Sequence, residues 1–178
     1  MMPDTLKALI RNVPDFPKPG ILFRDVTTLI GHGAGFAAAV CHLADRAEAV
    51  GAQAIAGIEA RGFIFGAAVA ARLGLGFVAV RKPGKLPVPV LAIDYALEYG
   101  TDTLEVDPDA VADGQTVVLI DDLIATGGTA LAALELLRKA GGVVELALFV
   151  IDLPDLGGAD RLREAGLAVG ALMEFPGH

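Results

Sequence analysis

The stretch that decides the fold reads VVLIDDLIATGGT and spans Val117 to Thr129. Together with Thr116, its first residues form a short apolar run, which is typical of a strand buried on both faces in a parallel sheet. Two acids, Asp121 and Asp122, come next, and a leucine-rich helical pattern follows the stretch. Between the acids and the helix, the loop consists of Ala125, Thr126, Gly127, Gly128 and Thr129. The expected order is therefore strand, acidic pair, glycine-bearing loop and helix.

The loop and the acids suit two different parts of one ligand. Backbone N–H groups of such a loop can turn around an anion, and the following helix adds the positive end of its dipole. The carboxylates suit hydroxyls or a divalent cation, and they lie where open α/β sheets bind ligands. A ribose 5-phosphate carries both kinds of group. A Walker A loop is excluded, because Gly128 is followed by Thr129 and Ala130 instead of Lys and Ser or Thr.

A purely structural interpretation competes with this one. A Gly-Gly pair before a helix is often only a tight turn, and an aspartate at a strand end is often only a helix cap. That interpretation explains the loop taken alone. It does not explain two acids, two threonines and a buried strand in one run, so we favour a ligand site.

The composition bounds the class of protein. The chain has 178 residues, enough for one domain with a sizeable core, and its net charge of −8 argues against DNA as a partner. No apolar run reaches the ~18 residues of a membrane span, and the first residues lack the pattern of a secretory signal. The single Cys41 excludes an internal disulfide and suits a reducing compartment. We expect a cytoplasmic domain that binds neither nucleic acid nor membrane.

Strands and helices are expected to alternate along the rest of the chain. The predicted helices cover residues 6–13, 35–50 and 63–73, and further strands or extended segments cover residues 21–27, 54–58, 77–80, 143–151 and 167–175. Residues 88–106 predict an antiparallel hairpin that turns near residues 99–101, outside the parallel sheet, and that can close over a reactive ligand. The alternation predicts an α/β fold with a mainly parallel central sheet flanked by helices.

Cations follow two of the predicted strands. Arg61 comes soon after the strand at 54–58, and the strand at 77–80 is followed by Arg81, Lys82 and Lys85. Because parallel strands end at one edge of a sheet, these cations can face an anion near Asp121. The alternatives are an ion pair between Arg61 and Glu59 and a solvated basic loop.

Several segments resemble one enzyme family. The stretch 117–129 resembles the phosphoribosyl-pyrophosphate signature of type I phosphoribosyltransferases. The segments DFPKPGILFRD (residues 15–25), EARG (59–62), RKPGKLP (81–87) and YALEYG (95–100) are similar to segments of the adenine phosphoribosyltransferases. The resemblance implies one domain over residues 1–178 with the type I phosphoribosyltransferase fold. An N-terminal arm and hood (1–30) and a flexible flap (82–106) belong to that expectation.

The resemblance also implies an activity, a cofactor and a partner. The reaction is transfer of the phosphoribosyl group from 5-phosphoribosyl 1-pyrophosphate (PRPP) to adenine, which gives AMP and pyrophosphate. Mg²⁺ would accompany the donor, and the protein would form a homodimer. The implied substrate-binding residues are Phe23, Arg24, Ala60, Arg61, Arg81, Lys85, Asp121, Asp122, Ala125, Thr126, Gly127, Gly128, Thr129 and Leu153. The implied catalytic residues are Glu98, Arg61 and Lys85.

Around the base, the resemblance assigns roles to four residues. Phe23 would stack near the purine, the backbone around Arg24 would hydrogen-bond its edge, and Leu153 would flank it. Glu98 would assist proton transfer from the purine nitrogen, directly or through water.

Around the donor, the resemblance assigns the remaining roles. The dipeptide Ala60-Arg61, which is often cis in the family, would bind the pyrophosphate together with Lys85. Arg81 would reach a neighbouring subunit's site. The loop 125–129 would hold the 5-phosphate. Asp121 and Asp122 would hold the ribose hydroxyls and orient Mg²⁺, directly or through water.

Two other functions fit parts of the sequence. A non-catalytic sensor would keep the PRPP site, but such proteins usually carry a DNA-binding segment, for which this chain has neither room nor positive charge. A transferase for another base, such as xanthine or orotate, would keep the same loop. The FRD and LEYG segments, at residues 23–25 and 97–100, argue against that second alternative.

Overall fold

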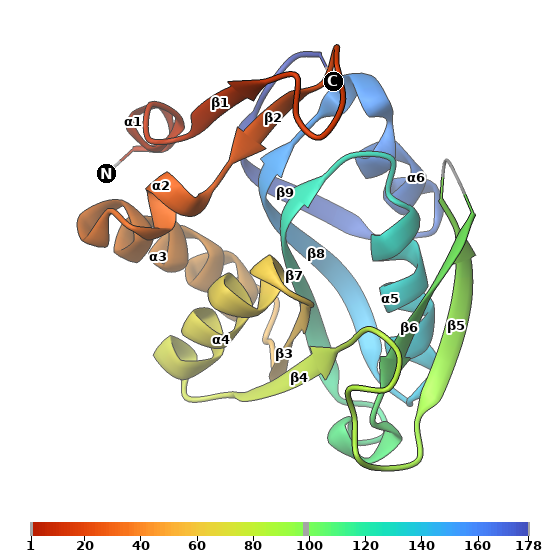
Figure 1. Ribbon diagram of the computed structural model, residues 1–178. Helices are drawn as coiled ribbons and strands as arrows, with labels where there is room; N and C mark the ends of the chain where they lie inside the picture. The colour runs from red at the N-terminus through yellow and green to blue at the C-terminus, as the bar shows by residue number, and fades with distance from the viewer. Residues whose placement is uncertain (1, 98–99, 178) are drawn as a thin grey trace.

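A five-stranded, fully parallel sheet forms the centre of the molecule (Figure 1). The computed structural model describes residues 2–97 and 100–177. In spatial order, the strands are β4 (Gly76–Val80), β3 (Ala54–Ile58), β7 (Thr116–Ile124), β8 (Val143–Asp152) and β9 (Ala168–Glu174). The strand that opens the deciding stretch is therefore the middle strand. This arrangement confirms the α/β fold that the sequence predicts.

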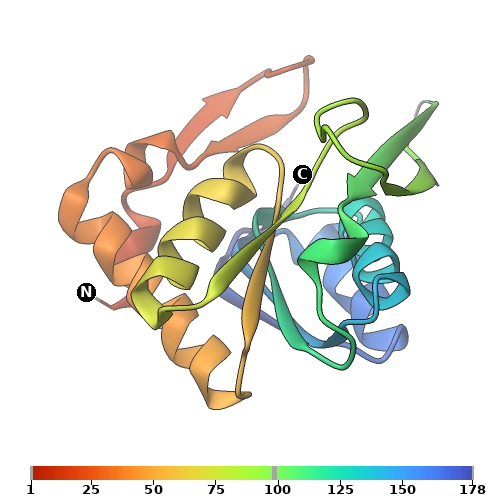
Figure 2. The ribbon, with the colours of Figure 1, turned by 90° about the horizontal axis from the view of Figure 1, so that it is seen from below.

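Helices cover both faces of the sheet, as Figure 2 shows. One face carries α1 (Pro3–Lys7), α2 (Thr27–Ile30), α3 (Gly33–Ala49) and α4 (Arg61–Leu73). The other face carries α5 (Gly128–Lys139) and α6 (Gly158–Glu164). Two short 3₁₀ turns, η1 (Pro108–Ala110) and η2 (Pro154–Leu156), precede β7 and follow β8. Each layer buries its own apolar cluster against the sheet, so β3, β7 and β8 are apolar on both sides, as buried parallel strands must be. Among the described residues, no helix combines the length and apolar character needed to cross a membrane.

An antiparallel hairpin lies over α5, outside the parallel sheet (Figure 1). It consists of β5 (Leu91–Ala96) and β6 (Thr101–Val106), close to the boundaries that the sequence predicts. Leu104 and Val106 are fully buried against the α5 layer. The base of the hairpin is therefore anchored in the core. Residue 98, the predicted proton-handling Glu98, lies outside the described residues.

A second antiparallel hairpin lies near the N-terminus, and it corrects one prediction. The helix expected over residues 6–13 is wrong: α1 ends at Lys7, and residues Arg11–Pro14 form β1, which pairs with β2 (Leu22–Asp25). Two physical effects decide against the helix. Pro14 disfavours helical geometry at the residue before it, and pairing with β2 supplies the backbone hydrogen bonds that a helix would otherwise make.

The central strand is also longer than expected. β7 continues through Asp121 and Asp122 to Ile124, because β8 pairs with it as far as Ile124 and Asp152. Aspartate has low strand propensity, but the backbone pairing with β8 outweighs it. Elsewhere the differences are small: α3 and α4 begin two residues earlier than predicted, and α2 was not predicted.

Asp25 anchors the N-terminal hairpin to α2. Its buried carboxylate accepts hydrogen bonds from the Thr27 hydroxyl (2.6 Å), the Thr27 N–H (2.9 Å) and Arg11 Nε (3.0 Å). The bonds from Thr27, with a contribution from Arg11 and against the effect of burial, lower the pKa of Asp25 from 3.8 to about 2. A carboxyl group whose pKa is lower in the folded state stabilises the fold at neutral pH.

We therefore expect Asp25→Asn to lower the free energy of unfolding at pH 7 by about 2 kcal/mol. Because the folded pKa lies below the unfolded one, this stabilisation is lost as the pH falls from about 4 to about 2. Urea unfolding of both proteins at pH 7 and pH 2.5 measures the difference. Asp15→Asn, at an exposed position of the same hairpin, is the control and is expected to change stability far less. An equal Asp25→Asn effect at both pH values would contradict the assignment.

Candidate active site

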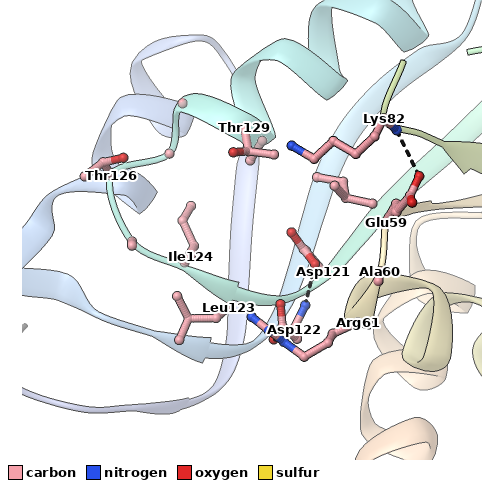
Figure 3. Close-up of a pocket in the computed structure, with 15 residues that line it drawn as sticks. Glu59, Ala60, Arg61, Lys82, Asp121, Asp122, Leu123, Ile124, Thr126 and Thr129 are labelled. Atoms are coloured by element: carbon pink, nitrogen blue, oxygen red, sulfur yellow. Dashed lines mark hydrogen bonds and ion pairs between the residues drawn. The ribbon is translucent and has the colours of Figure 1, made fainter. Parts of the chain in front are cut away.

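A polar cavity of about 340 Å³ opens at the carboxyl edge of the central sheet (Figure 3). The loop 125–129, which joins β7 to the N-terminus of α5, forms one wall. The opposite wall comes from the end of β3 and the start of α4. The cavity is thus lined by all five loop residues and by Glu59, Ala60, Arg61, Lys82, Asp121 and Asp122. The residues of the deciding stretch that were predicted to bind phosphate and ribose therefore all line this cavity.

The loop is held from behind by the start of α6. The Gly158 N–H donates to the Ala125 carbonyl at 2.9 Å, and Arg161 Nη1 donates to the Thr126 carbonyl at 2.6 Å. Gly127 has φ +82°, a conformation that favours glycine. A Cβ on Gly158 would come within 2.7 Å of the Gly127 nitrogen. The loop therefore keeps its shape through close backbone contacts with α6, a role for Gly158 and Arg161 that the sequence analysis missed.

The two acids have different surroundings. Asp122 is 6 % exposed and forms an ion pair with Arg61. Asp121 accepts a hydrogen bond from the Asp122 N–H at 2.8 Å. Figure 3 shows Asp121 directed toward the Lys82 side of the cavity and Asp122 toward Arg61, as expected for neighbours in a strand. The ion pair expected as an alternative, Arg61 with Glu59, does not form.

The charges of this cluster influence one another. Desolvation and the neighbouring charge of Asp122 raise the pKa of Asp121 well above its usual range. Burial disfavours the charged form of Arg61, but the Asp122 carboxylate outweighs it and raises the pKa of Arg61. A hydroxyl donor or a cation bound at this place would stabilise the ionised form of Asp121, which its surroundings disfavour. The acids thus suit hydroxyls or a divalent cation, as the sequence analysis expects.

Glu59 organises the basic segment after β4. It accepts hydrogen bonds from the Lys82 N–H (2.9 Å) and from Arg81 Nε (3.2 Å). The Lys82 N–H, helped by Arg81 and against the effect of burial, lowers the pKa of Glu59. The start of this segment is thus held at the end of β3, and the side chain of Lys82 lines the cavity, whereas Arg81 and Lys85 do not. Lys85 is exposed, so the structure brings Lys82 to the cavity in its place.

The loop before α4 contains a cis peptide bond, one residue earlier than the resemblance implies. The bond joins Glu59 to Ala60, not Ala60 to Arg61. Both Ala60 and Arg61 line the cavity.

A second cavity, of about 470 Å³, lies under the N-terminal hairpin. Phe16 and Phe23 line it with their rings edge to face at 5.2 Å, and Arg61 borders it as well as the polar cavity. The Arg61 guanidinium lies 5.7 Å from the centre of the Phe23 ring. One arginine thus stands between an aromatic cavity and a phosphate-type cavity.

Two residues that the resemblance places near the base do not line this second cavity. The Arg24 side chain donates to Asn12 Oδ1 (2.6 Å) and to the Pro176 carbonyl (3.1 Å), away from it. Leu153 is buried in the core, where its N–H donates to the Ile124 carbonyl at 3.0 Å.

The fold and the phosphate-type loop define a phosphoribosyltransferase, and comparison supports this class. Residues 30–165 match the family model of the phosphoribosyl transferase domain. Adenine phosphoribosyltransferase of Novosphingobium aromaticivorans is 71 % identical over 178 residues, all of both chains. The chain therefore belongs to the adenine phosphoribosyltransferase family, as its resemblance implied.

Solved structures of the family superpose closely. Adenine phosphoribosyltransferase from Thermoanaerobacter pseudethanolicus is 46 % identical, with a TM-score of 0.92 over 98 % of this chain and 100 % of that one. The Saccharomyces cerevisiae enzyme is 36 % identical, with a TM-score of 0.89 over 96 % of this chain and 98 % of that one. That structure is a complex with D-2,5-dideoxy-2,5-imino-altritol 1,6-bisphosphate and adenine.

Proposed function

We propose that this protein transfers the phosphoribosyl group of PRPP to adenine, forming AMP and pyrophosphate in purine salvage. The observation that carries the proposal is the pair of cavities that share Arg61. One is polar and ends in a loop suited to a phosphate, and the other is aromatic and suited to a flat base. Support also comes from the yeast relative, which is complexed with adenine and a sugar-like bisphosphate.

The polar cavity would hold the donor by its two ends. The backbone N–H groups and threonine hydroxyls of loop 125–129 bind the 5-phosphate, with the N-terminus of α5 behind them. Asp121 and Asp122 accept the ribose hydroxyls. Arg61 and Lys82, on the opposite wall, face the diphosphate. Holding both ends places the anomeric carbon between the two cavities.

The chemical step breaks the anomeric C–O bond to the diphosphate and forms the C–N bond to the purine. Positive charge develops on the sugar as in glycoside chemistry, and negative charge grows on the leaving diphosphate. Arg61 and Lys82 stabilise that growing charge, and Lys85 joins them when its loop approaches the ligand. The purine nitrogen releases a proton, and Glu98, outside the described residues, is the proposed acceptor.

The base would bind under the N-terminal hairpin. Phe23 offers an aromatic face, and the backbone of Arg24 offers a donor and an acceptor for the purine edge. The Arg24 side chain serves a different purpose: it lies 4.6 Å from the centre of the Phe175 ring and ties the hairpin to the segment that follows β9. Leu153 is buried and does not line this cavity, so its role beside the base stays a prediction.

Mg²⁺ is proposed to arrive with the donor. Within residues 2–97 and 100–177, no three His, Cys, Asp or Glu side chains gather as a metal site. Mg²⁺ commonly binds through one or two carboxylates, waters and substrate phosphates, so Asp121 and Asp122 fit it, directly or through water. When bound, the metal would neutralise charge on the diphosphate.

Further parts of the family expectation are proposals too. We propose that residues 1–178 act as one domain, that residues 1–30 form a hood over the base, and that residues 82–106 act as a flap. A homodimer in which Arg81 reaches the neighbouring site, and a cytoplasmic location, stay predictions.

Pyrophosphate release tests the proposed function. The protein is incubated with PRPP and Mg²⁺ and with adenine, guanine, hypoxanthine, xanthine or orotate in turn. We expect release with adenine alone, and loss of that release when EDTA removes the metal. Release with another base instead of adenine would overturn the base assignment. Donor binding without release for any base would favour the non-catalytic sensor.

A further inference from the structure

A polar cluster joins the β5–β6 hairpin to the active-site cavity. Tyr95 and Asp102 are directly opposed residues of β5 and β6, and Lys82 reaches them from the segment after β4. The Lys82 ammonium forms an ion pair with Asp102 Oδ2 and donates to the Tyr95 hydroxyl at 3.2 Å. That hydroxyl donates to the same Asp102 oxygen at 3.2 Å. The three side chains therefore form a closed triangle.

The same cluster touches the phosphate-type loop. Thr129 Oγ1 donates to the Tyr95 hydroxyl at 3.4 Å. Lys82 lines the cavity, and Figure 3 shows its side chain directed toward Thr129. Ala96, the residue of β5 after Tyr95, also lies close to the loop, because a Cβ on Gly128 would lie 3.4 Å from the Ala96 carbonyl oxygen. The hairpin thus contacts the loop, and Tyr95 is the side chain that links both to Lys82.

The charges in the cluster hold the lysine in its ionised form. Burial disfavours the Lys82 ammonium, but its hydrogen bonds to Asp102 and Tyr95 outweigh this effect and raise its pKa. The hydrogen bond from Lys82 lowers the pKa of Asp102. An ammonium group has three N–H donors, and the two contacts with Asp102 and Tyr95 fix its direction. The remaining donor is available to a phosphate oxygen in the cavity.

We infer that Tyr95, held by Asp102, is a positioning residue that orients the Lys82 ammonium toward the phosphates of the donor. Tyr95 would act only through Lys82 and the loop, without touching the reacting atoms. The inference rests on the proposed function, since it takes PRPP as the ligand. It adds a role for the base of the hairpin, whose buried residues keep Tyr95 in place before the donor arrives.

The hairpin offers a matched control at the next pair of residues. Asp94 and Thr103 oppose each other beside Tyr95 and Asp102, and Thr103 Oγ1 donates to Asp94 Oδ1 at 2.6 Å in an exposed position. Neighbouring residues of a strand face opposite sides. Thr103→Val therefore removes a cross-strand hydrogen bond of the same hairpin without touching Lys82.

A double-mutant cycle tests the inference. Steady-state kinetics are measured for the unaltered protein, Tyr95→Phe, Lys82→Met, the double variant and Thr103→Val. We expect Tyr95→Phe to raise KM for PRPP about fivefold, the typical effect of one lost hydrogen bond, with KM for adenine unchanged. In the Lys82→Met background, Tyr95→Phe should change KM for PRPP less than about twofold, because the group that Tyr95 orients is gone. Thr103→Val should leave both constants unchanged.

Three outcomes would overturn the inference. Tyr95→Phe could raise KM for PRPP equally in both backgrounds, or it could raise KM for adenine as much as KM for PRPP. The third outcome is an equal rise in KM for PRPP from Thr103→Val. Melting temperatures of all variants show whether each one is folded, and Lys82→Arg should retain the dependence on Tyr95 if a charged donor is what Tyr95 orients. An unaltered protein without adenine turnover would contradict the proposed function itself. An active protein whose KM does not respond to Tyr95→Phe would contradict only the role of Tyr95.

Discussion

Arg61→Met is expected to lower kcat/KM for PRPP about 100- to 1,000-fold, the usual effect of removing a group that stabilises transition-state charge. The guanidinium borders both cavities and pairs with Asp122, so it lies where the diphosphate would leave and near the base. Pyrophosphate release at varied PRPP concentrations measures the change. Arg61→Lys keeps the charge but not the planar geometry, so its kcat/KM for PRPP should lie between those of the unaltered protein and Arg61→Met.

Stability must be separated from catalysis in this variant. Asp122 is 6 % exposed, and removing its cation leaves a buried carboxylate at a cost of about 1–3 kcal/mol. The double variant Arg61→Met/Asp122→Asn should recover the melting temperature without recovering activity. Arg46→Met is a control for the loss of a cation, because Arg46 donates to the Ala171 carbonyl on β9 (3.2 Å), outside both cavities. Near-normal turnover by Arg61→Met would remove Arg61 from the mechanism.

The second large effect is expected at a glycine outside the deciding stretch. In Gly158→Ala the new methyl group would lie 2.7 Å from the Gly127 nitrogen and even closer to the Ala125 carbonyl oxygen. Both are backbone atoms, so the loop must shift, and overpacking of this kind costs about 1–3 kcal/mol. A displaced phosphate loop loses alignment of the donor, which corresponds to about a 100-fold loss of kcat/KM. Kinetics with varied PRPP and urea unfolding measure the two effects.

The neighbouring glycine gives the control. Gly157 has φ +72°, but a Cβ there meets no atom within 4 Å. Gly157→Ala should therefore cost about 1 kcal/mol of backbone strain and leave KM for PRPP near its normal value. Equal kinetic losses in the two variants would show that strain at the start of α6, and not the contact with the loop, controls the site.

Local order along the chain explains which parts of the site were predictable. The loop 125–129 and the acids before it are neighbours in sequence, so their joint position needed only the strand and helix around them. The same holds for β3 and the start of α4, which place Ala60 and Arg61 in the cavity. The β5–β6 hairpin was predicted because its alternating pattern and turn are also local.

Pairing over long distances explains the errors. Residues 11–14 have a pattern that a helix could use, and they form a strand only because β2 lies beside them. The spacing of Lys82 and Lys85 in the sequence does not indicate which of the two lines the cavity. Glu59, on another strand end, accepts the Lys82 N–H, and Asp102 and Tyr95 of the β5–β6 hairpin hold its ammonium. Lys82 therefore lines the cavity, while Lys85 is exposed.

By itself, the sequence determined the α/β class, the central strand, the phosphate-type loop and the family to which the protein belongs. The first three features follow from residues close together in the chain, whose periodicity and spacing are read directly, and the family follows from the resemblance of its motifs. Only the tertiary structure decided that Arg61 pairs with Asp122 instead of Glu59, that Gly158 supports the loop, and that Tyr95 meets Lys82. Such contacts join different strands and helices, so they depend on the register and packing of the whole sheet.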